Sequence, residues 1–143
     1  MTTYIDTNVI ISFVDEEDPD HERALKLIDR LPRDRVVSML TLVELVSVYS
    51  RANLEKPIAL AFYSIDIVKA KIVDVDFSTV LRKALTYAHQ LKLRALDLLH
   101  MITASIIGCK KFVTFDSEII RKSNAIASTL GIEVLTDIIE NAA

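Results

Sequence analysis

The stretch TYIDTNVII, residues 3–11, places an acid between two apolar segments. Its β-branched and aromatic residues predict a strand over Thr2–Ile5 that ends at Asp6, and the apolar run resumes at Val9. A buried carboxylate is unfavourable unless a cation or several hydrogen-bond donors compensate it. Asp6 therefore needs partners that only the rest of the chain can supply.

The composition is that of a well-packed globular protein. Hydrophobic residues make up 51% and charged residues 26% of the 143 residues, which excludes a disordered chain. We expect one domain over residues 1–143, long enough to bury roughly two thirds of its unfolded surface. The absence of a membrane-length apolar run and of a secretory signal predicts a cytoplasmic protein. The single cysteine, Cys109, is expected to be a buried small residue.

Short apolar runs alternate with longer stretches of helical period. The predicted strands are Thr2–Ile5, Arg35–Met39, Lys71–Val75, Lys111–Phe115 and Ile132–Leu135. The predicted helices cover about 20–31, 41–53, 56–70, 77–92, 96–107 and 117–130, with a short last helix near 136–142. Because strands separated by helices pair in parallel, we expect an α/β fold: a three-layer α/β/α sandwich around a mainly parallel five-stranded sheet.

Four acids lie near the ends of these strands or in the helices that follow. Asp6 follows the first strand, and Asp116 follows the fourth in KKFVTFDSE, residues 110–118. Glu44 lies in the helix after the second strand, within SMLTLVELVSVYS, residues 38–50. Asp97 opens an apolar helix in LRALDLLHMITA, residues 93–104. In open parallel sheets, ligands bind beyond the carboxyl ends of the strands, so chemistry is expected there.

Helix capping is the simpler explanation for each acid taken singly. Asp6, Asp97 and Asp116 could each cap a helix, and Thr41-x-x-Glu44 fits a capping box. Capping does not explain the surroundings of Glu44 and Asp97, because both lie among apolar residues on helices expected to be buried. Buried ions of this kind need a counter-charge.

Convergence of the four carboxylates in one cleft would raise several of their pKa values unless cations neutralised them. A divalent metal does so, and a set of ligands made only of carboxylate oxygens favours Mg²⁺ or Mn²⁺ over Zn²⁺. Such ions polarise phosphodiesters and lower the pKa of a bound water. The pattern therefore indicates metal-dependent phosphodiester chemistry.

The four acidic segments, in this order, resemble the motifs of the PIN-domain ribonucleases, in particular the single-domain VapC-type toxins. The segments are YIDTNVII, TLVEL, LRALDLLHMITA and FVTFDSEI, and the resemblance covers residues 4 to about 134. It implies a PIN-like fold and hydrolysis of RNA with Mg²⁺ or Mn²⁺. By position, Asp6, Asp97 and Asp116 would hold the metal, while Glu44 would bind the metal or its water and help to activate the nucleophile.

Neighbouring polar residues would support these acids. By the same resemblance, Asn8 and Thr114 would orient carboxylates or waters. The Thr7 hydroxyl either lies near the metal or caps a helix, and both interpretations stay open. His100 is three residues after Asp97, so we expect contact between them, as a structural hydrogen bond in preference to general base catalysis.

The net charge of -3 alone argues against a protein that coats nucleic acid. Without the four site acids the remainder carries +1, so RNA stays a possible substrate. Basic residues that could steer RNA are Arg51, Arg82, Lys83, Lys92, Arg94, Arg121 and Lys122, although each is also an ordinary surface residue.

Residues 54–70, LEKPIALAFYSIDIVKA, are apolar on more faces than one buried side requires. The segment is either buried within the monomer or a patch for self-association or for an inhibitory partner. The resemblance implies a homodimer that a small antitoxin protein holds inactive.

Two other enzyme and signalling classes fit less well. A haloacid-dehalogenase-like phosphatase needs a second Asp at position 8, which is Asn. A receiver module needs paired acids on its first strand, where Asp6 stands alone. A PIN-fold module that binds RNA or protein without cutting remains an alternative.

Overall fold

Five parallel strands form the centre of the protein, in the order β3-β2-β1-β4-β5. The computed structural model describes residues 2–137. The strands are β1 (Thr3–Ile5), β2 (Arg35–Val37), β3 (Lys71–Ile72), β4 (Lys111–Val113) and β5 (Glu133–Leu135). Strand β1 lies at the centre of the sheet and pairs with β2 on one side and with β4 on the other. The strand order therefore reverses at β1. The predicted fold class is confirmed.

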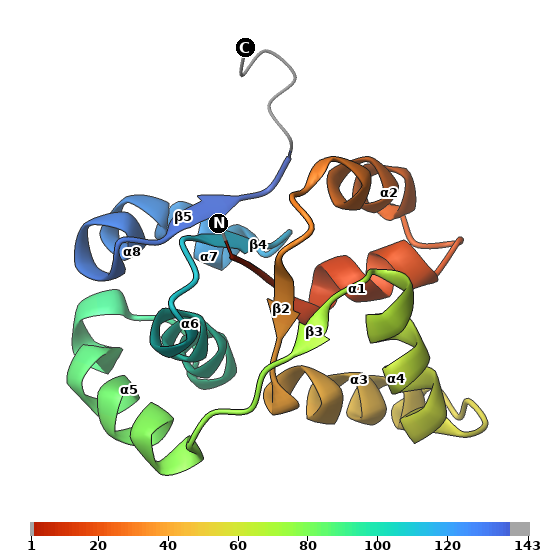
Figure 1. Ribbon diagram of the computed structural model, residues 1–143, viewed down its shortest axis with the longest axis horizontal. Helices are drawn as coiled ribbons and strands as arrows, with labels where there is room; N and C mark the ends of the chain where they lie inside the picture. The colour runs from red at the N-terminus through yellow and green to blue at the C-terminus, as the bar shows by residue number, and fades with distance from the viewer. Residues whose placement is uncertain (1, 138–143) are drawn as a thin grey trace.

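Helices cover both faces of the sheet (Figure 1). They are α1 (Thr7–Val14), α2 (His21–Arg30), α3 (Met39–Arg51), α4 (Pro57–Ile67), α5 (Phe77–Leu91), α6 (Ala95–Ile107), α7 (Ser117–Arg121) and α8 (Ser123–Leu130). In Figure 1, α5, α6 and α8 lie on one side of the sheet and α1 to α4 on the other.

The alternation of side chains along the short strands builds a separate core on each face. On β1, Tyr4 packs with residues of α5, α6 and α8, while Ile5 packs with residues of α1 to α4. Phe112 and Val113 on β4 divide in the same way. Because both faces are covered, the strands are buried and apolar, as is typical of parallel sheets. Cys109 is buried in the first of these cores, as predicted.

Several predicted elements differ in extent from those observed. Helix α1 was not predicted, because its apolar residues follow one another closely, as they do in a buried strand. The predicted helix over 117–130 is two helices, which meet at Lys122. No Gly or Pro marks that junction. The short helix predicted near 136–142 falls almost entirely outside the described residues.

No helix within residues 2–137 is both long enough and apolar enough to cross a bilayer.

Candidate active site

Asp6 and Asp116 lie at the carboxyl edge of the sheet, just beyond the paired strands β1 and β4. Each is the N-cap of the helix that follows. Oδ1 of Asp6 accepts a hydrogen bond from the Thr7 backbone N–H at 2.9 Å, and Oδ1 of Asp116 accepts one from the Glu118 N–H at 2.8 Å. The capping interpretation is thus right for both residues. It occupies only one oxygen of each carboxylate.

The second oxygen of Asp6 is held by side chains from two segments. Oδ2 accepts a hydrogen bond from the Thr114 hydroxyl at 2.7 Å and one from the Asn8 amide at 3.3 Å. The Asn8 side-chain oxygen accepts from the Phe115 backbone N–H at 3.1 Å, which ties α1 to the end of β4. Thr114 and Asn8 therefore fix the orientation of a carboxylate that is only 4% exposed.

Glu44 is held by a hydrogen-bonded row of buried side chains. Its Oε1 lies 3.0 Å from Nε2 of His100, and Nδ1 of His100 lies 2.8 Å from the Tyr4 hydroxyl. That hydroxyl is also 2.8 Å from the Ser38 hydroxyl. A carboxylate can only accept, so Nε2 of His100 donates to Glu44. The imidazole therefore links Glu44 to the buried Tyr4 hydroxyl and holds the Glu44 carboxylate beside Asp6.

Asp97 is the third residue of α6 and caps no helix. Its Oδ2 lies 3.5 Å from Nε of Arg94, whose NH2 group donates to Oδ2 of Asp116 at 3.1 Å. Burial and the nearby charge of Asp116 raise the pKa of Asp97, and Arg94 opposes that rise. Asp97 and Asp116 thus share one positively charged partner, the guanidinium of Arg94.

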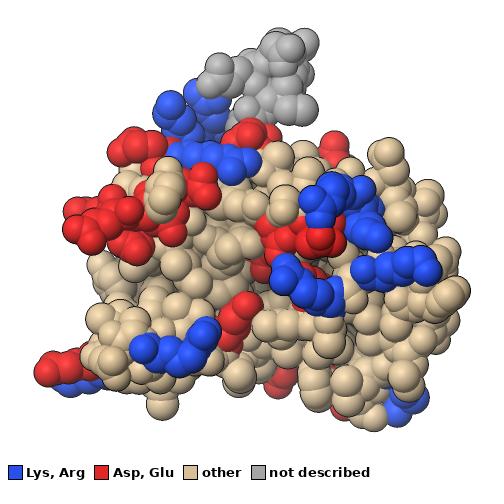
Figure 2. All heavy atoms as spheres, turned by 180° about the vertical axis from the view of Figure 1, so that it is seen from behind, with Lys and Arg blue, Asp and Glu red and all other residues tan. Residues whose placement is uncertain are grey.

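The four carboxylates line a single hollow of about 410 Å³. The other residues that line it are Asn8, Arg94 and Leu96. On the face seen in Figure 2, acidic side chains lie in a recess bordered by basic ones. The structure therefore brings together residues from four segments that are up to 110 positions apart, between Asp6 and Asp116.

The charges in the hollow perturb one another. Burial raises the pKa of Asp6 to about 6, with smaller contributions from the charges of Glu44 and Asp97 in the same direction. Burial alone would raise the pKa of Glu44, but the hydrogen bond from His100, the Thr7 hydroxyl and the charge of His100 together lower it below its ordinary value. At neutral pH the site therefore gathers negative charge that one arginine only partly neutralises.

The Thr7 hydroxyl is the one unexplained polar group beside these acids. Thr7 is 1% exposed, and its Oγ1 has no partner that meets hydrogen-bond geometry within the described residues. It nevertheless lies close enough to Glu44 to help lower the pKa of that carboxyl. A buried hydroxyl without such a partner is rare, and this one lies beside two acids that could hold a cation, Asp6 and Glu44.

The family model of the PIN domain matches residues 3–125 of this sequence. The chain belongs to the PIN domain family. The match contains all four acids that line the hollow, together with Asn8 and Thr114. Comparison with curated proteins finds no match.

Several solved structures share this fold. A sarcin-ricin loop cleaving toxin of Mycobacterium tuberculosis, VapC20, aligns with a TM-score of 0.68 at 15% identity, over 90% of this chain and 96% of that one. FitAcB from Neisseria gonorrhoeae aligns with a TM-score of 0.64 at 19% identity, over 94% and 97%. A toxin-antitoxin complex from Klebsiella pneumoniae aligns with a TM-score of 0.63 at 17% identity, over the same shares.

Two local expectations for this PIN domain differ from the structure. His100 was expected to contact Asp97, but both nitrogens of its ring engage other groups, Tyr4 and Glu44. The capping box of α3 is formed by Ser38 and Thr41, because the helix begins at Met39, earlier than predicted. Glu44 is thus free of any capping role and its carboxylate faces the hollow.

Sequence reasoning missed Tyr4 and Ser38 as supports of the site. A signal was present, because a tyrosine in a buried strand needs a partner for its hydroxyl. The tyrosine alone does not show which residue its hydroxyl contacts, and His100 is 96 residues away. Arg94 was considered only as one of several basic residues, whereas it lines the hollow of the PIN domain.

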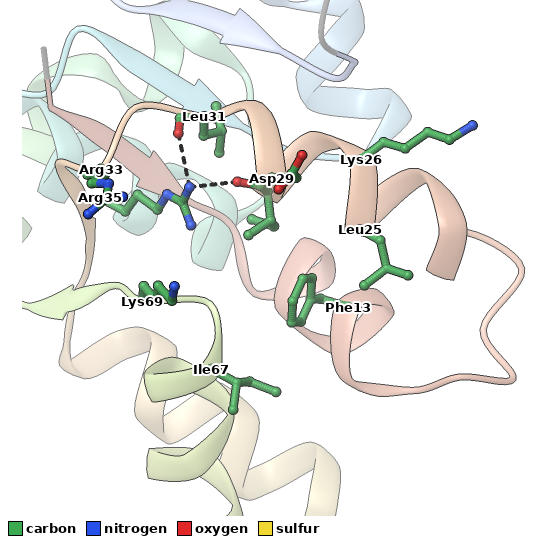
Figure 3. Close-up of a pocket in the computed structure, with 10 residues that line it drawn as sticks. Phe13, Leu25, Lys26, Asp29, Leu31, Arg33, Arg35, Ile67 and Lys69 are labelled. Atoms are coloured by element: carbon green, nitrogen blue, oxygen red, sulfur yellow. Dashed lines mark hydrogen bonds between the residues drawn. The ribbon is translucent and has the colours of Figure 1, made fainter.

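A larger hollow, of about 840 Å³, lies between α2 and α4 and shares no residue with the acidic one. Figure 3 shows Arg35 beside it, with its guanidinium directed at the carbonyl groups that end α2. Arg33 and Lys69 lie near Arg35, and apolar side chains such as Phe13 and Ile67 line the rest. This hollow has no cluster of acids, so we place no metal chemistry there.

Proposed function

We propose that this PIN domain is an endoribonuclease that uses Mg²⁺ or Mn²⁺ to hydrolyse RNA phosphodiester bonds, as the toxin of a VapBC-type toxin–antitoxin pair. The observation that carries the proposal is the single hollow lined by Asp6, Glu44, Asp97 and Asp116. The RNA substrate is supported by the family and by VapC20, whose described activity is cleavage of the sarcin-ricin loop.

The residues of the hollow fit a hard divalent cation. All four acids offer carboxylate oxygens, which Mg²⁺ and Mn²⁺ prefer. The raised pKa of buried Asp6 and the buried Thr7 hydroxyl beside Glu44 both support a cation or its water as part of the working site. Asp6, Asp97 and Asp116 would hold the cation, and Glu44 would hold the cation or its water. When bound, such an ion polarises the scissile phosphodiester and acidifies a coordinated water.

The chain itself orients these groups. Thr114 and Asn8 keep Oδ2 of Asp6 in place, and the row from Ser38 through Tyr4 to His100 keeps Oε1 of Glu44 in place. Because the pKa of Glu44 is lowered, its carboxylate is charged at neutral pH. Its other oxygen, Oε2, is then able to accept the proton of the attacking water.

Cleavage of a labelled RNA in Mn²⁺ tests the proposal. Asp6→Asn and Asp97→Asn keep the shape of the side chain but remove its charge, so we expect each to lower the rate by at least about a hundredfold. Asp29→Asn is the matched control, because Asp29 is exposed on α2 and is absent from the lining of the hollow. Folding of each variant is checked by circular dichroism.

Two outcomes would reject the proposal. Cleavage by both site variants in the presence of a chelator would mean that the hollow is not the catalytic site. Binding of RNA by the wild type in Mn²⁺ without any cleavage would indicate a PIN-fold module that binds and does not cut.

We further propose that the protein acts in the cytoplasm as a homodimer and binds a small antitoxin protein. Support for an antitoxin comes from solved relatives that are toxin–antitoxin complexes. Support for self-association comes from α4, whose Ile58, Phe62 and Tyr63 are 62%, 50% and 57% exposed. Apolar side chains gathered on one surface helix are typical of an interface.

A further inference from the structure

Arg94 is the only basic residue among those that line the acidic hollow of the described chain. It precedes α6 as its N-cap, three residues before Asp97. Its guanidinium bridges two carboxylates from different elements, because Nε is 3.5 Å from Oδ2 of Asp97 and NH2 is 3.1 Å from Oδ2 of Asp116. The arginine thus occupies two of the oxygens that a divalent cation bound by Asp97 and Asp116 would also use.

The Arg94 guanidinium is exposed to solvent, so another cation can replace it at the two carboxylates. The Arg94 side chain is 72% exposed, whereas those of Asp97 and Asp116 are 18% and 19% exposed. The carboxylates consequently lie deeper in the hollow, and the guanidinium lies at its mouth. Ion pairs with a solvent-exposed partner are weak and screened by salt, so a competing cation can replace this one.

A divalent cation and the guanidinium would compete for the same two oxygens. Two cations close together repel each other, and each Oδ2 that turns to a metal is lost to the arginine. Once released, the guanidinium stays near the mouth of the hollow, because its backbone is fixed at the start of α6. A planar guanidinium binds phosphate oxygens in a bidentate manner.

We propose that Arg94 exchanges partners during the reaction cycle. In the metal-free protein it neutralises Asp97 and Asp116, it competes with the divalent cation for their oxygens, and when displaced it binds a backbone phosphate of the RNA substrate. This inference rests on the proposed function, since it requires both the metal site and an RNA substrate.

Calorimetric titration with Mn²⁺ and no RNA tests the first half. Arg94→Gln removes the competing cation, so it binds Mn²⁺ about three- to tenfold more tightly than the wild type, and Arg94→Lys falls between them. Arg33→Gln is the control, because it removes the same charge from a different place. Arg33 is exposed and precedes β2, so it lies at the amino ends of the strands, opposite the hollow. The Mn²⁺ affinity of this control stays within about twofold of wild type.

Equal or weaker Mn²⁺ binding by Arg94→Gln overturns the competition. A wild type that binds no Mn²⁺ overturns the metal site itself and the proposed function with it. Thermal melting confirms that the variants are folded, and Arg94→Lys, which keeps the charge, provides a second folded variant.

Steady-state cleavage of a labelled RNA tests the second half, at Mn²⁺ concentrations that saturate each variant. Arg94→Gln raises KM about tenfold while kcat changes by less than about threefold, because a phosphate contact made before the reaction is lost. The slope of log KM against log salt concentration falls by about 0.7, the value for one phosphate contact on a single strand. A residue with only a structural role would not change that slope. Unchanged KM and slope overturn the phosphate contact, whereas an inactive wild type overturns the proposed function.

Discussion

Asp6 combines a structural role with the chemical role that we propose for it. Oδ1 caps α1, and Oδ2 is fixed by Thr114 and Asn8 beside the other acids. Its charge is nevertheless poorly compensated in the metal-free protein, since burial raises its pKa to about 6 from an unfolded value of 3.8. The proton on Asp6 therefore stabilises the fold fully below about pH 3.8, and that stabilisation is lost as the pH rises through about 6.

Unfolding by urea in the presence of a chelator measures this effect. The shift of about two pKa units corresponds to about 3 kcal/mol at most. The unfolding free energy of the wild type, relative to that of Asp6→Asn, should fall by up to about this amount between about pH 4 and about pH 7. Other carboxyls titrate in both proteins, so the difference reports the titration of Asp6 together with its interaction with Glu44 and Asp97. Parallel pH profiles for the two proteins would show that Asp6 titrates normally.

Tyr4 connects the hydrophobic core to Glu44, because its hydroxyl is hydrogen-bonded to His100, which in turn contacts Glu44. Tyr4→Phe removes the hydroxyl that is hydrogen-bonded to Nδ1 of His100, so the imidazole loses one of its two hydrogen-bond partners. We expect a loss of about 1–2 kcal/mol in unfolding free energy and a fall of roughly tenfold or more in RNA cleavage, because the support of a site carboxylate is loosened. Tyr87→Phe, on α5 away from the hollow, is the control. Wild-type cleavage by Tyr4→Phe would exclude a positioning role for the row.

At the scale of elements, Arg35 joins helix ends that would otherwise expose carbonyl groups. Its guanidinium donates to Pro32 and Val68 carbonyls at 3.0 Å and to those of Ile28 and Leu31 at the end of α2 (Figure 3). A positive charge beside the carboxyl ends of two helices is favourable, because those ends carry partial negative charge. Arg35 thus binds β2 to α2 and to the end of α4.

Arg35→Met keeps most of the apolar stem but leaves these carbonyls without donors. We expect a loss of about 3–5 kcal/mol in unfolding free energy, measured by urea denaturation. Arg33→Met, two residues earlier and exposed, should change stability by less than about 0.5 kcal/mol. Similar stabilities for the two variants would mean that the carbonyls find other donors or water.

The comparison of elements shows what the sequence can and cannot predict. All five strands were predicted in position, because short β-branched runs between helical stretches are a strong local signal. Helix α1 was missed because the apolar residues of TNVIISFV follow one another closely, so a short buried helix and a buried strand give the same local pattern. The partner of His100 was also wrong, since side-chain direction across 56 residues is decided by tertiary packing and not by spacing along one helix.

At the scale of the whole molecule, topology explains why distant acids could be grouped from sequence. In a parallel sheet every strand ends at the same edge, so residues after β1 and β4 are neighbours whatever lies between them. Glu44 and Asp97 were assigned to the same site because each is a charged residue in an apolar helix and needs a compensating charge. Arg94 could not be assigned in this way, because an exposed arginine before a helix has many possible partners.

Self-association belongs to this scale too. If the exposed face of α4 is the interface, sedimentation equilibrium should give twice the chain mass of 16.1 kDa for the wild type and the monomer mass for Phe62→Asp. Leu85→Asp is the control, because Leu85 is 79% exposed on another helix, α5. Dissociation by Leu85→Asp and not by Phe62→Asp would move the interface to α5.

The central claim is that the four acids hold one divalent site, and anomalous diffraction from crystals soaked in Mn²⁺ tests it most directly. We predict an anomalous difference peak inside the hollow, within coordination distance of oxygens from Asp6, Asp97 and Asp116. A peak only elsewhere, or none in crystals whose dissolved protein cuts RNA with Mn²⁺, would contradict the account.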